Sequence, residues 1–219
     1  MSSEPILPFT GQSTPGLLVV LEGVSRSGKT TLGQQLAEKS PRPVRRVKWN
    51  SHAELAPVTA ELTRRSELSG LTSTLLFIAD LRLTFEAVAL PALQAGEIVV
   101  YDRYVYSGWI RGLLRGVPEE LLRQITAVFP RPDLTLFLDP GMETITDRFL
   151  RTRKGGGWFG VGRDLYDRRF PDRLDADDVE LDAFTWFCGE QLRMYRELAD
   201  TEGFVREDHV QSFLDLLDR

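Results

Sequence analysis

Residues 23–30 have the types and spacing of a loop that binds nucleotide phosphates. The stretch fits the pattern G-x-x-x-x-G-K-S/T, and its members are Gly23, Val24, Ser25, Arg26, Ser27, Gly28, Lys29 and Thr30. In such a loop the glycines let backbone N–H groups converge on a phosphate at a helix N-terminus. The lysine bridges the β- and γ-phosphates, and the final hydroxyl binds Mg²⁺. The pattern predicts a site for ATP or GTP, with Thr30 as a metal ligand.

The segments on either side of this loop are those that a phosphate-binding loop requires. Residues 17–21 form a continuous apolar and partly β-branched run, which is typical of a strand buried on both faces. Residues 30–39 have helical spacing. The alternative is a chance match in an ordinary strand-to-helix turn, and the matching context argues against it.

Arg26 places a positive charge inside the loop. A guanidinium at this point can reach the transferring phosphoryl group and supply the charge that some GTPases take from a partner protein. The alternative is an exposed arginine that faces water.

Asp102 and Arg103 follow directly after another apolar run, residues 98–101. Ligands of a doubly wound sheet collect at the carboxyl ends of its strands, so these side chains are expected near the loop. Asp102 can bind Mg²⁺ or orient the Thr30 hydroxyl, and Arg103 can hold a phosphate through paired N–H groups. An isolated surface ion pair is the alternative. We predict that Lys29, Arg26, Asp102 and Arg103 form the catalytic set.

The elements that must position these residues alternate along the chain. Apolar runs predict strands at residues 17–21, 44–49, 98–101, 134–138 and 204–205. Helical spacing predicts helices at residues 30–39, 53–68, 71–94, 118–128, 142–153, 179–199 and 209–217. This alternation predicts the α/β class, a P-loop NTPase three-layer sandwich whose five-stranded parallel sheet carries helices on both faces. Residues 1–16 are predicted to be a flexible leader, and residues 17–219 a single kinase domain.

Glycine and positive charge are concentrated at residues 154–172, where the helical pattern breaks down. Such a segment can act as a mobile lid that closes over phosphates, with Arg153, Lys154 and Arg163 as its basic residues. A disordered surface loop is the alternative.

Composition limits the remaining possibilities. The net charge of −5, from 32 acidic and 27 basic residues, gives no overall positive field, so neither nucleic acid nor a membrane is an expected partner. One cysteine and two histidines supply neither an internal disulfide nor a closed zinc site. The early apolar run is too short to span a bilayer. These features favour a cytoplasmic location.

From about residue 17 to its end, the chain resembles the thymidylate kinase family. The segments that carry the resemblance are LEGV at 21–24, GKTT at 28–31, LLFIAD at 75–80, PAL at 91–93, DRYVYSG at 102–108, PDLTLFLD at 132–139 and YRELA at 195–199. The resemblance implies a nucleoside monophosphate kinase that uses Mg²⁺ and ATP to convert dTMP to dTDP. It also makes a homodimer possible, with small nucleotides as the other partners.

The resemblance assigns roles to individual residues. Phe77 stands where the family stacks the acceptor base, Arg103 where it contacts phosphates, and Arg148 where it lies against the donor adenine. The predicted ATP-binding residues are Gly23, Ser25, Arg26, Ser27, Gly28, Lys29, Thr30, Thr31 and Arg148. The predicted acceptor-binding residues are Phe77, Arg82, Arg103, Tyr106, Trp109 and Trp49.

The acceptor side departs from the family pattern at three places. Ser25 replaces an aspartate for the sugar hydroxyl, Leu81 replaces an arginine for the thymine edge, and residues 50–52 replace an arginine for the acceptor phosphate. Tryptophans at 49, 109 and 158 can supply a new stacking surface, with core packing as the alternative. The acceptor is therefore dTMP or else another nucleotide, a nucleoside or a small hydroxylated molecule. A nucleotide-binding module without catalysis is the remaining alternative.

Overall fold

The computed structural model describes residues 14–64, 68–152, 157–175 and 177–206, and its centre is a five-stranded parallel sheet. The strands are β1 (Leu17–Glu22), β2 (Val44–Lys48), β3 (Ile98–Asp102), β4 (Leu134–Phe137) and β5 (Val205–Arg206). They lie in the order β2-β3-β1-β4-β5, so that β1 pairs with β3 on one side and β4 on the other. The prediction of five parallel strands is confirmed, with strand ends displaced by one residue at most.

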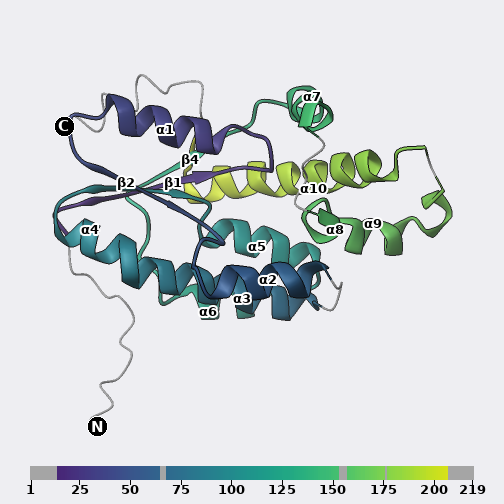
Figure 1. Ribbon diagram of the computed structural model, residues 1–219, viewed down its shortest axis with the longest axis horizontal. Helices are drawn as coiled ribbons and strands as arrows, with labels where there is room; N and C mark the ends of the chain where they lie inside the picture. Colours follow the sequence, from purple (N-terminus) through teal and green to yellow (C-terminus); the bar gives the residue numbers. More distant parts are fainter. Residues whose placement is uncertain (1–13, 65–67, 153–156, 176, 207–219) are drawn as a thin grey trace, which may run out of the picture.

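Helices cover both faces of the sheet, as the three-layer prediction requires (Figure 1). α1 (Lys29–Lys39) lies on one face, and α3 (Gly70–Thr84), α4 (Leu90–Gln94) and α5 (Val105–Leu114) lie on the other. The remaining helices are α2 (Leu55–Arg64), α6 (Glu119–Thr126), α7 (Met142–Thr152), α8 (Gly157–Gly160), α9 (Arg163–Arg169), the 3-10 turn η2 (Pro171–Arg173) and α10 (Val179–Glu202).

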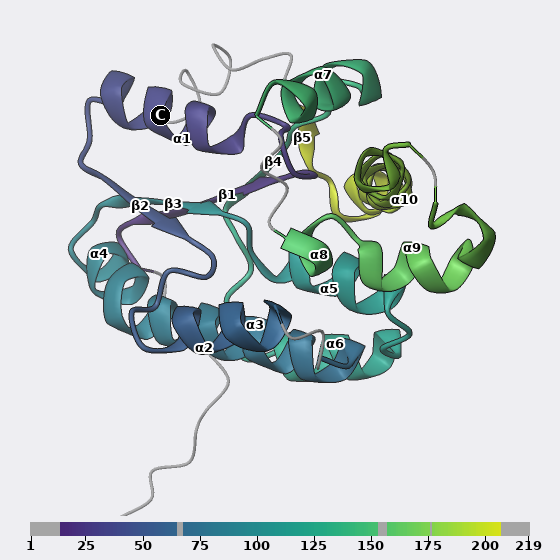
Figure 2. The same cartoon turned by 45° about the vertical axis from the view of Figure 1, so that its right-hand side comes forward.

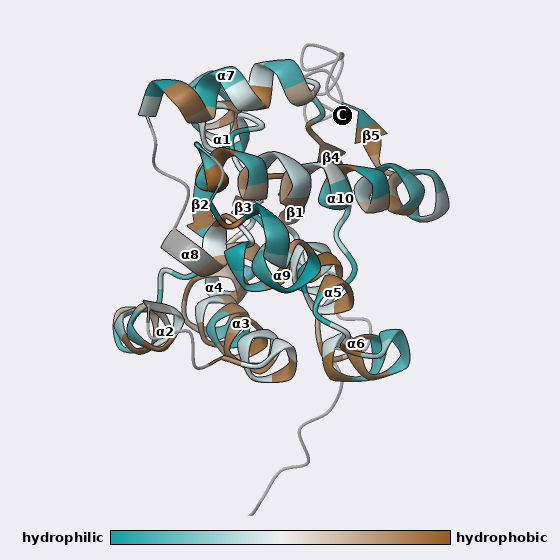
Figure 3. Cartoon of the chain, turned by 90° about the vertical axis from the view of Figure 1, so that its right-hand side faces the viewer, coloured by the Kyte–Doolittle hydropathy of each residue, from teal (hydrophilic) through white to brown (hydrophobic). Residues whose placement is uncertain are grey.

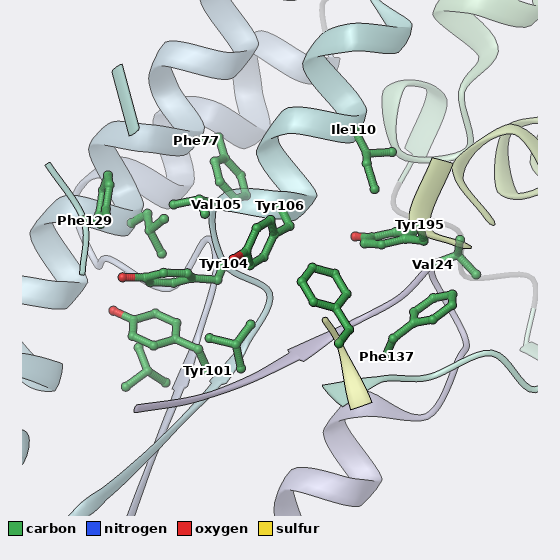
Figure 4. Close-up of a cluster of buried hydrophobic side chains, with 14 of the residues drawn as sticks. Val24, Phe77, Tyr101, Tyr104, Val105, Tyr106, Ile110, Phe129, Phe137 and Tyr195 are labelled. Atoms are coloured by element: carbon green, nitrogen blue, oxygen red, sulfur yellow. The ribbon is translucent and has the colours of Figure 1, made fainter. Parts of the chain in front are cut away.

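Successive residues of β1 point to opposite faces of the sheet and enter two separate cores. Val19 and Leu21 pack with Leu32 and Leu36 of α1. Leu18 and Val20 belong to a larger cluster with many aromatic side chains, among them Phe77, Tyr101, Tyr104, Tyr106, Phe137 and Tyr195 (Figure 4). Because both faces are covered, β1 is apolar without alternation.

Helix α5 was absent from the predicted elements, although it follows the catalytic strand β3 directly. Its sequence contains Gly108 and Gly112, which lower helix propensity. The structure gives the reason for both. A Cβ on Gly108 would lie 2.7 Å from Cε1 of Phe77, and one on Gly112 would lie 3.0 Å from Thr74 and Leu122. The neighbouring helices approach so closely that both positions require glycine. The same glycines weaken the helical signal of this segment in the sequence.

The single helix predicted at residues 71–94 is interrupted by a π-helical turn, η1 (Phe85–Ala89). The amide of Leu90 bonds to the carbonyl of Phe85, and Pro91 follows as a residue without an N–H donor. A proline inside a helix removes one backbone bond, and a π turn is one way to absorb that loss.

The glycine-rich segment is helical where it is described. α8 and α9 lie beside α5 and α10 at one end of the molecule (Figure 2), so a disordered loop does not account for residues 157–173. Its role as a lid stays a prediction. Arg153 and Lys154, the helix predicted at residues 209–217 and most of the leader lie outside the described residues.

None of the helices in the described ranges combines the length and apolar character needed to cross a bilayer. A single chain does not test the homodimer, which stays a prediction.

Candidate active site

The loop between β1 and α1 has a backbone that only particular residues can adopt. Gly23 and Gly28 have φ angles of 142° and 111°, and Arg26 has a φ of 69°. A Cβ on Gly23 would lie 2.7 Å from the Leu138 carbonyl oxygen. α1 begins directly at Lys29, and no side chain caps it at Gly28. The helix N-terminus therefore remains available to an anion, as the sequence predicts.

Lys29 is buried within the loop. Its Nζ donates hydrogen bonds to the Val24 carbonyl at 2.6 Å, the Gly23 carbonyl at 3.1 Å and Ser27 Oγ at 3.0 Å. Burial, together with the charge of Arg103, lowers the pKa of Lys29 well below its usual value, although Asp102 and Glu22 oppose this. The nearby carboxylates thus do not offset the burial of the ammonium, and a bound phosphate would add the missing negative charge.

Asp102 lies beside the loop because β3 pairs with β1, with Leu21 opposite Asp102. The Thr30 hydroxyl donates a hydrogen bond to Asp102 Oδ2 at 2.6 Å. A hydroxyl and a carboxylate at this distance are oxygen ligands of the kind that Mg²⁺ takes alongside phosphate and water. The predicted metal pair therefore fits the ion.

Arg103 also lies against the loop. It has a φ of 78°, and its Nη1 donates to the Gly23 carbonyl at 2.9 Å and to Ser107 Oγ at 3.1 Å. The side chain is buried apart from the atoms that line the cavity described below. Two fixed contacts thus hold this guanidinium next to the position of the phosphates.

Glu22, which was not singled out from the sequence, joins three elements beneath the loop. Its Oε1 accepts hydrogen bonds from the amides of Tyr104 and Ser107, at 2.9 and 3.2 Å. Its Oε2 accepts from the Ser107 hydroxyl at 2.6 Å and from the Tyr195 hydroxyl at 2.9 Å. Burial raises the pKa of Glu22, whereas these hydrogen bonds and Arg103 lower it. The sequence does contain a signal for this role. Glu22 is a carboxylate at the end of an apolar strand, where a charged group needs buried hydrogen-bond partners.

A cavity of about 1180 Å³ opens beside the loop and brings most of the predicted donor residues together. The predicted residues that line it are Ser25, Arg26, Ser27, Gly28, Lys29, Thr30, Thr31, Trp49, Asp102, Arg103 and Arg148. Arg148 donates from Nη1 to the Arg26 carbonyl at 2.8 Å. Nε of Arg26 is buried and has no hydrogen-bond partner among the described residues. The cavity thus has a cationic wall around the loop.

Phe77 lies outside the large cavity. It lines a neighbouring space of about 30 Å³ with Trp49, Gly108 and Arg111. The rings of Trp49 and Phe77 are 5.1 Å apart and inclined by 41°. Trp49 therefore lies over Phe77, on the aromatic face that the resemblance assigns to the acceptor base.

Three predicted acceptor residues do not reach either cavity. Arg82 donates to Glu86 at 2.6 Å and to the Val128 carbonyl at 3.1 Å. Tyr106 packs on Phe204, with ring centroids 4.7 Å apart, and Trp109 donates to Thr126 at 2.9 Å. These side chains lie on helix faces that do not line either cavity. For Tyr106 and Trp109 the face could not be assigned because α5 was unrecognised, whereas Arg82 lies on the predicted helix at residues 71–94 and its direction depends on its contacts with Glu86 and Val128. The side chain of Trp158 lies outside the described residues.

Helices α8 and α9 are held against α5 by a buried ion pair. Arg115 Nε lies 2.8 Å from Asp164 Oδ2, and the two side chains are 3% and 7% exposed. Arg115 Nη2 also donates to the Phe159 carbonyl at 3.2 Å, and Phe159 lines the large cavity. Figure 3 shows α9 beside α5, with mostly hydrophilic residues along its ribbon. Arg163, which was predicted to face phosphates, pairs instead with Asp167 at 2.6 Å.

Replacing Arg115 with methionine should loosen α8 and α9. The change leaves Asp164 as a buried carboxylate without its partner, which is a costly arrangement. We expect amide hydrogen exchange in α9 to become at least about 10-fold faster, whereas Arg163→Met removes a more exposed pair and should change it little. Equal exchange rates in the two variants would show that the Arg115 pair does not hold these helices.

The amino-acid sequence is similar to those of thymidylate kinases. Residues 21–155 match the family described as thymidylate kinase. A probable thymidylate kinase from Pyrococcus abyssi is 39% identical over 140 residues, which cover 59% of this chain and 68% of that protein. The thymidylate kinase of Mycoplasmopsis agalactiae is 29% identical over 217 residues, which cover 92% and 91% of the two chains.

Proposed function

Because this chain belongs to the thymidylate kinase family and is therefore a P-loop nucleotide kinase, we propose that it transfers the terminal phosphate of Mg²⁺-bound ATP to dTMP. The observation that carries the proposal is the joint placement of Lys29, Arg103 and the Thr30–Asp102 pair around one phosphate-binding loop. A protein that only bound nucleotide would not need cations on both sides of the transferring group.

The reaction joins an oxygen of the acceptor phosphate to the γ-phosphorus and breaks the bond to the β–γ bridging oxygen, leaving ADP. The main demands are alignment and neutralisation of the charge on the moving group. Lys29 and the loop amides hold the β- and γ-phosphates, and Arg26 and Arg103 offset charge on the transferring group. Thr30 and Asp102 would hold magnesium, which would supply Lewis-acid neutralisation of the phosphate charge. α8 and α9 exclude water beside the loop.

One observation favours a second candidate acceptor. The Trp49 ring lies 5.1 Å from that of Phe77 and is tilted against it, and the space beside Phe77 is only about 30 Å³, which is too small for a thymine ring. Leu81, where the resemblance expects an arginine, is fully buried and offers a base no hydrogen bond. Binding of dTMP requires the Trp49 side chain to turn away. A kinase for another small phosphorylated acceptor needs no such movement.

Measuring ADP release from Mg²⁺-ATP with a panel of acceptors tests the proposal. The panel contains dTMP, other nucleoside monophosphates, nucleosides and a sample without acceptor. We expect the largest release with dTMP. A larger release with a different acceptor would transfer the assignment to that acceptor, and tight ATP binding with no release from any acceptor would contradict a kinase.

Replacing Asp102 with asparagine should raise the Mg²⁺ concentration needed for half-maximal rate by about 10-fold. The amide keeps the shape of the side chain but removes the negative charge beside Thr30. Titrating Mg²⁺ at saturating ATP measures the change. Asp200→Asn, an exposed carboxylate paired with Arg206, is the control. The same Mg²⁺ requirement in both variants would show that Asp102 does not bind the metal.

A further inference from the structure

Arg111 lies on the face of α5 that carries the loop contacts. Arg103 donates to Ser107, and Arg111 follows Ser107 by four residues, which places the two on one side of the helix. Arg111 lines the large cavity with Lys29 and Arg103, and it also lines the small space beside Phe77. Its side chain therefore stands where the two cavities meet.

The guanidinium of Arg111 contacts two aromatic rings but has no carboxylate partner among the described residues. The guanidinium carbon lies 5.3 Å from the centre of the Trp49 ring and 5.9 Å from that of Phe187. Its Nε is buried and has no hydrogen-bond partner in the described ranges, and no carboxylate there lies within ion-pair distance of the group. Aromatic faces fix the position of the guanidinium but do not neutralise it.

The charged groups near Arg111 are also positive. Burial and the nearby charges of Arg103 and Arg115 lower its pKa to about 9, which still leaves the group charged at neutral pH. Arg115 has its own carboxylate partner in Asp164, whereas Arg111 has none among the described side chains. An anion in the cavity would neutralise the charge of Arg111.

The loop after β2 does not supply a phosphate-binding arginine. It contains Asn50, Ser51 and His52, and the amides of Asn50 and His52 donate to Asp80 at 2.7 and 3.1 Å. The Asp80 carboxylate thus fixes this loop through its backbone. Arg103 and Arg111 line the same cavity as the donor loop and are the cationic alternative.

We propose that Arg111 binds the phosphate group of the acceptor, together with Arg103. An acceptor whose base lies on the Phe77 side must direct its phosphate toward the loop, and Arg111 stands between the two. The guanidinium fork matches phosphate oxygens through paired hydrogen bonds. This inference rests on the proposed function, since it concerns the acceptor of the same reaction.

The test compares binding of dTMP and thymidine to the whole protein by calorimetry, with Arg111→Met as the variant. Methionine keeps much of the length and packing between the rings but removes the charge. We expect the dissociation constant for dTMP to rise by about 10–100-fold, while that for thymidine, which has no phosphate, stays unchanged. In turnover, the KM for dTMP should rise and the KM for ATP should not. Arg46→Met, an exposed residue of β2, is the matched control.

A dTMP dissociation constant within twofold of the wild-type value in Arg111→Met would overturn the inference and leave the proposed function standing. If the wild type neither binds nor phosphorylates dTMP, the proposed function fails instead. Inorganic phosphate, added with the donor site filled by Mg²⁺-ADP, then probes Arg111 directly. Loss of the phosphate-induced rise in melting temperature in Arg111→Met supports the inference, and an equal or absent rise in both proteins contradicts it.

Discussion

Replacing Lys29 with methionine should lower kcat by about 10²–10³-fold while the protein remains folded. The Lys29 side chain joins both sides of the turn, through Gly23, Val24 and Ser27. In the transition state, the variant would lack the Lys29 charge on the γ-phosphate, and Arg26 and Arg103 would offset only the remaining part of the developing charge. Steady-state rates at saturating ATP and acceptor measure the loss, and circular dichroism verifies the fold.

Lys39→Met is the control for this prediction, because Lys39 is exposed at the far end of the same helix. We expect its kcat to match that of the wild type. The pKa of Lys29 is already lowered by burial, so removing this cation relieves a desolvation cost and should not unfold the chain. Full activity in Lys29→Met would show that this loop does not take part in catalysis.

Replacing Glu22 with alanine should lower the free energy of unfolding by about 3–5 kcal/mol. The change leaves the buried amides of Tyr104 and Ser107 without their acceptor and removes the carboxylate that accepts from the hydroxyls of Ser107 and Tyr195, which keep only their contact with each other at 2.8 Å as an outlet for a proton. It also leaves a void where β1, α5 and α10 meet. For a chain of this size, the loss corresponds to a fall in melting temperature of about 10 °C. Urea denaturation and thermal scans measure both quantities.

Glu38→Ala tests whether the effect belongs to the buried site. Glu38 is an exposed residue of α1 whose side chain accepts a hydrogen bond from Gln34. Surface changes of this kind are usually within about 0.5 kcal/mol. A loss below about 1 kcal/mol in Glu22→Ala would mean that the four donors find other partners.

The sheet could be predicted because its signals are local. Residues 17–21 are apolar without alternation since both faces of β1 are covered, and the glycine spacing that follows is needed for the φ values of Gly23 and Gly28. Thr30 and Asp102 could be paired because neighbouring parallel strands end at the same edge. These features depend on short stretches of sequence and on one rule of sheet geometry.

The parts that could not be predicted depend on contacts between distant segments. Gly108 interrupts the helical pattern of α5 because Phe77, 31 positions earlier, approaches its Cα closely. The position of Trp49 beside Phe77 follows from the attachment of the loop after β2 to Asp80 of α3, which no local pattern encodes. Arg111 could not be singled out because its helix was unrecognised. Arg82 and Tyr106 were placed by resemblance, and only the folded helices show that they turn away from the cavity.

Transfer of a labelled phosphate tests the central claim most directly. The protein is incubated with Mg²⁺, dTMP and ATP that carries a radioactive terminal phosphate, and the nucleotides are then separated. We expect the label in dTDP, at a rate that falls by about 10²–10³-fold in Lys29→Met. Label that stays in ATP, or that appears only in inorganic phosphate at every dTMP concentration, would contradict phosphoryl transfer to this acceptor.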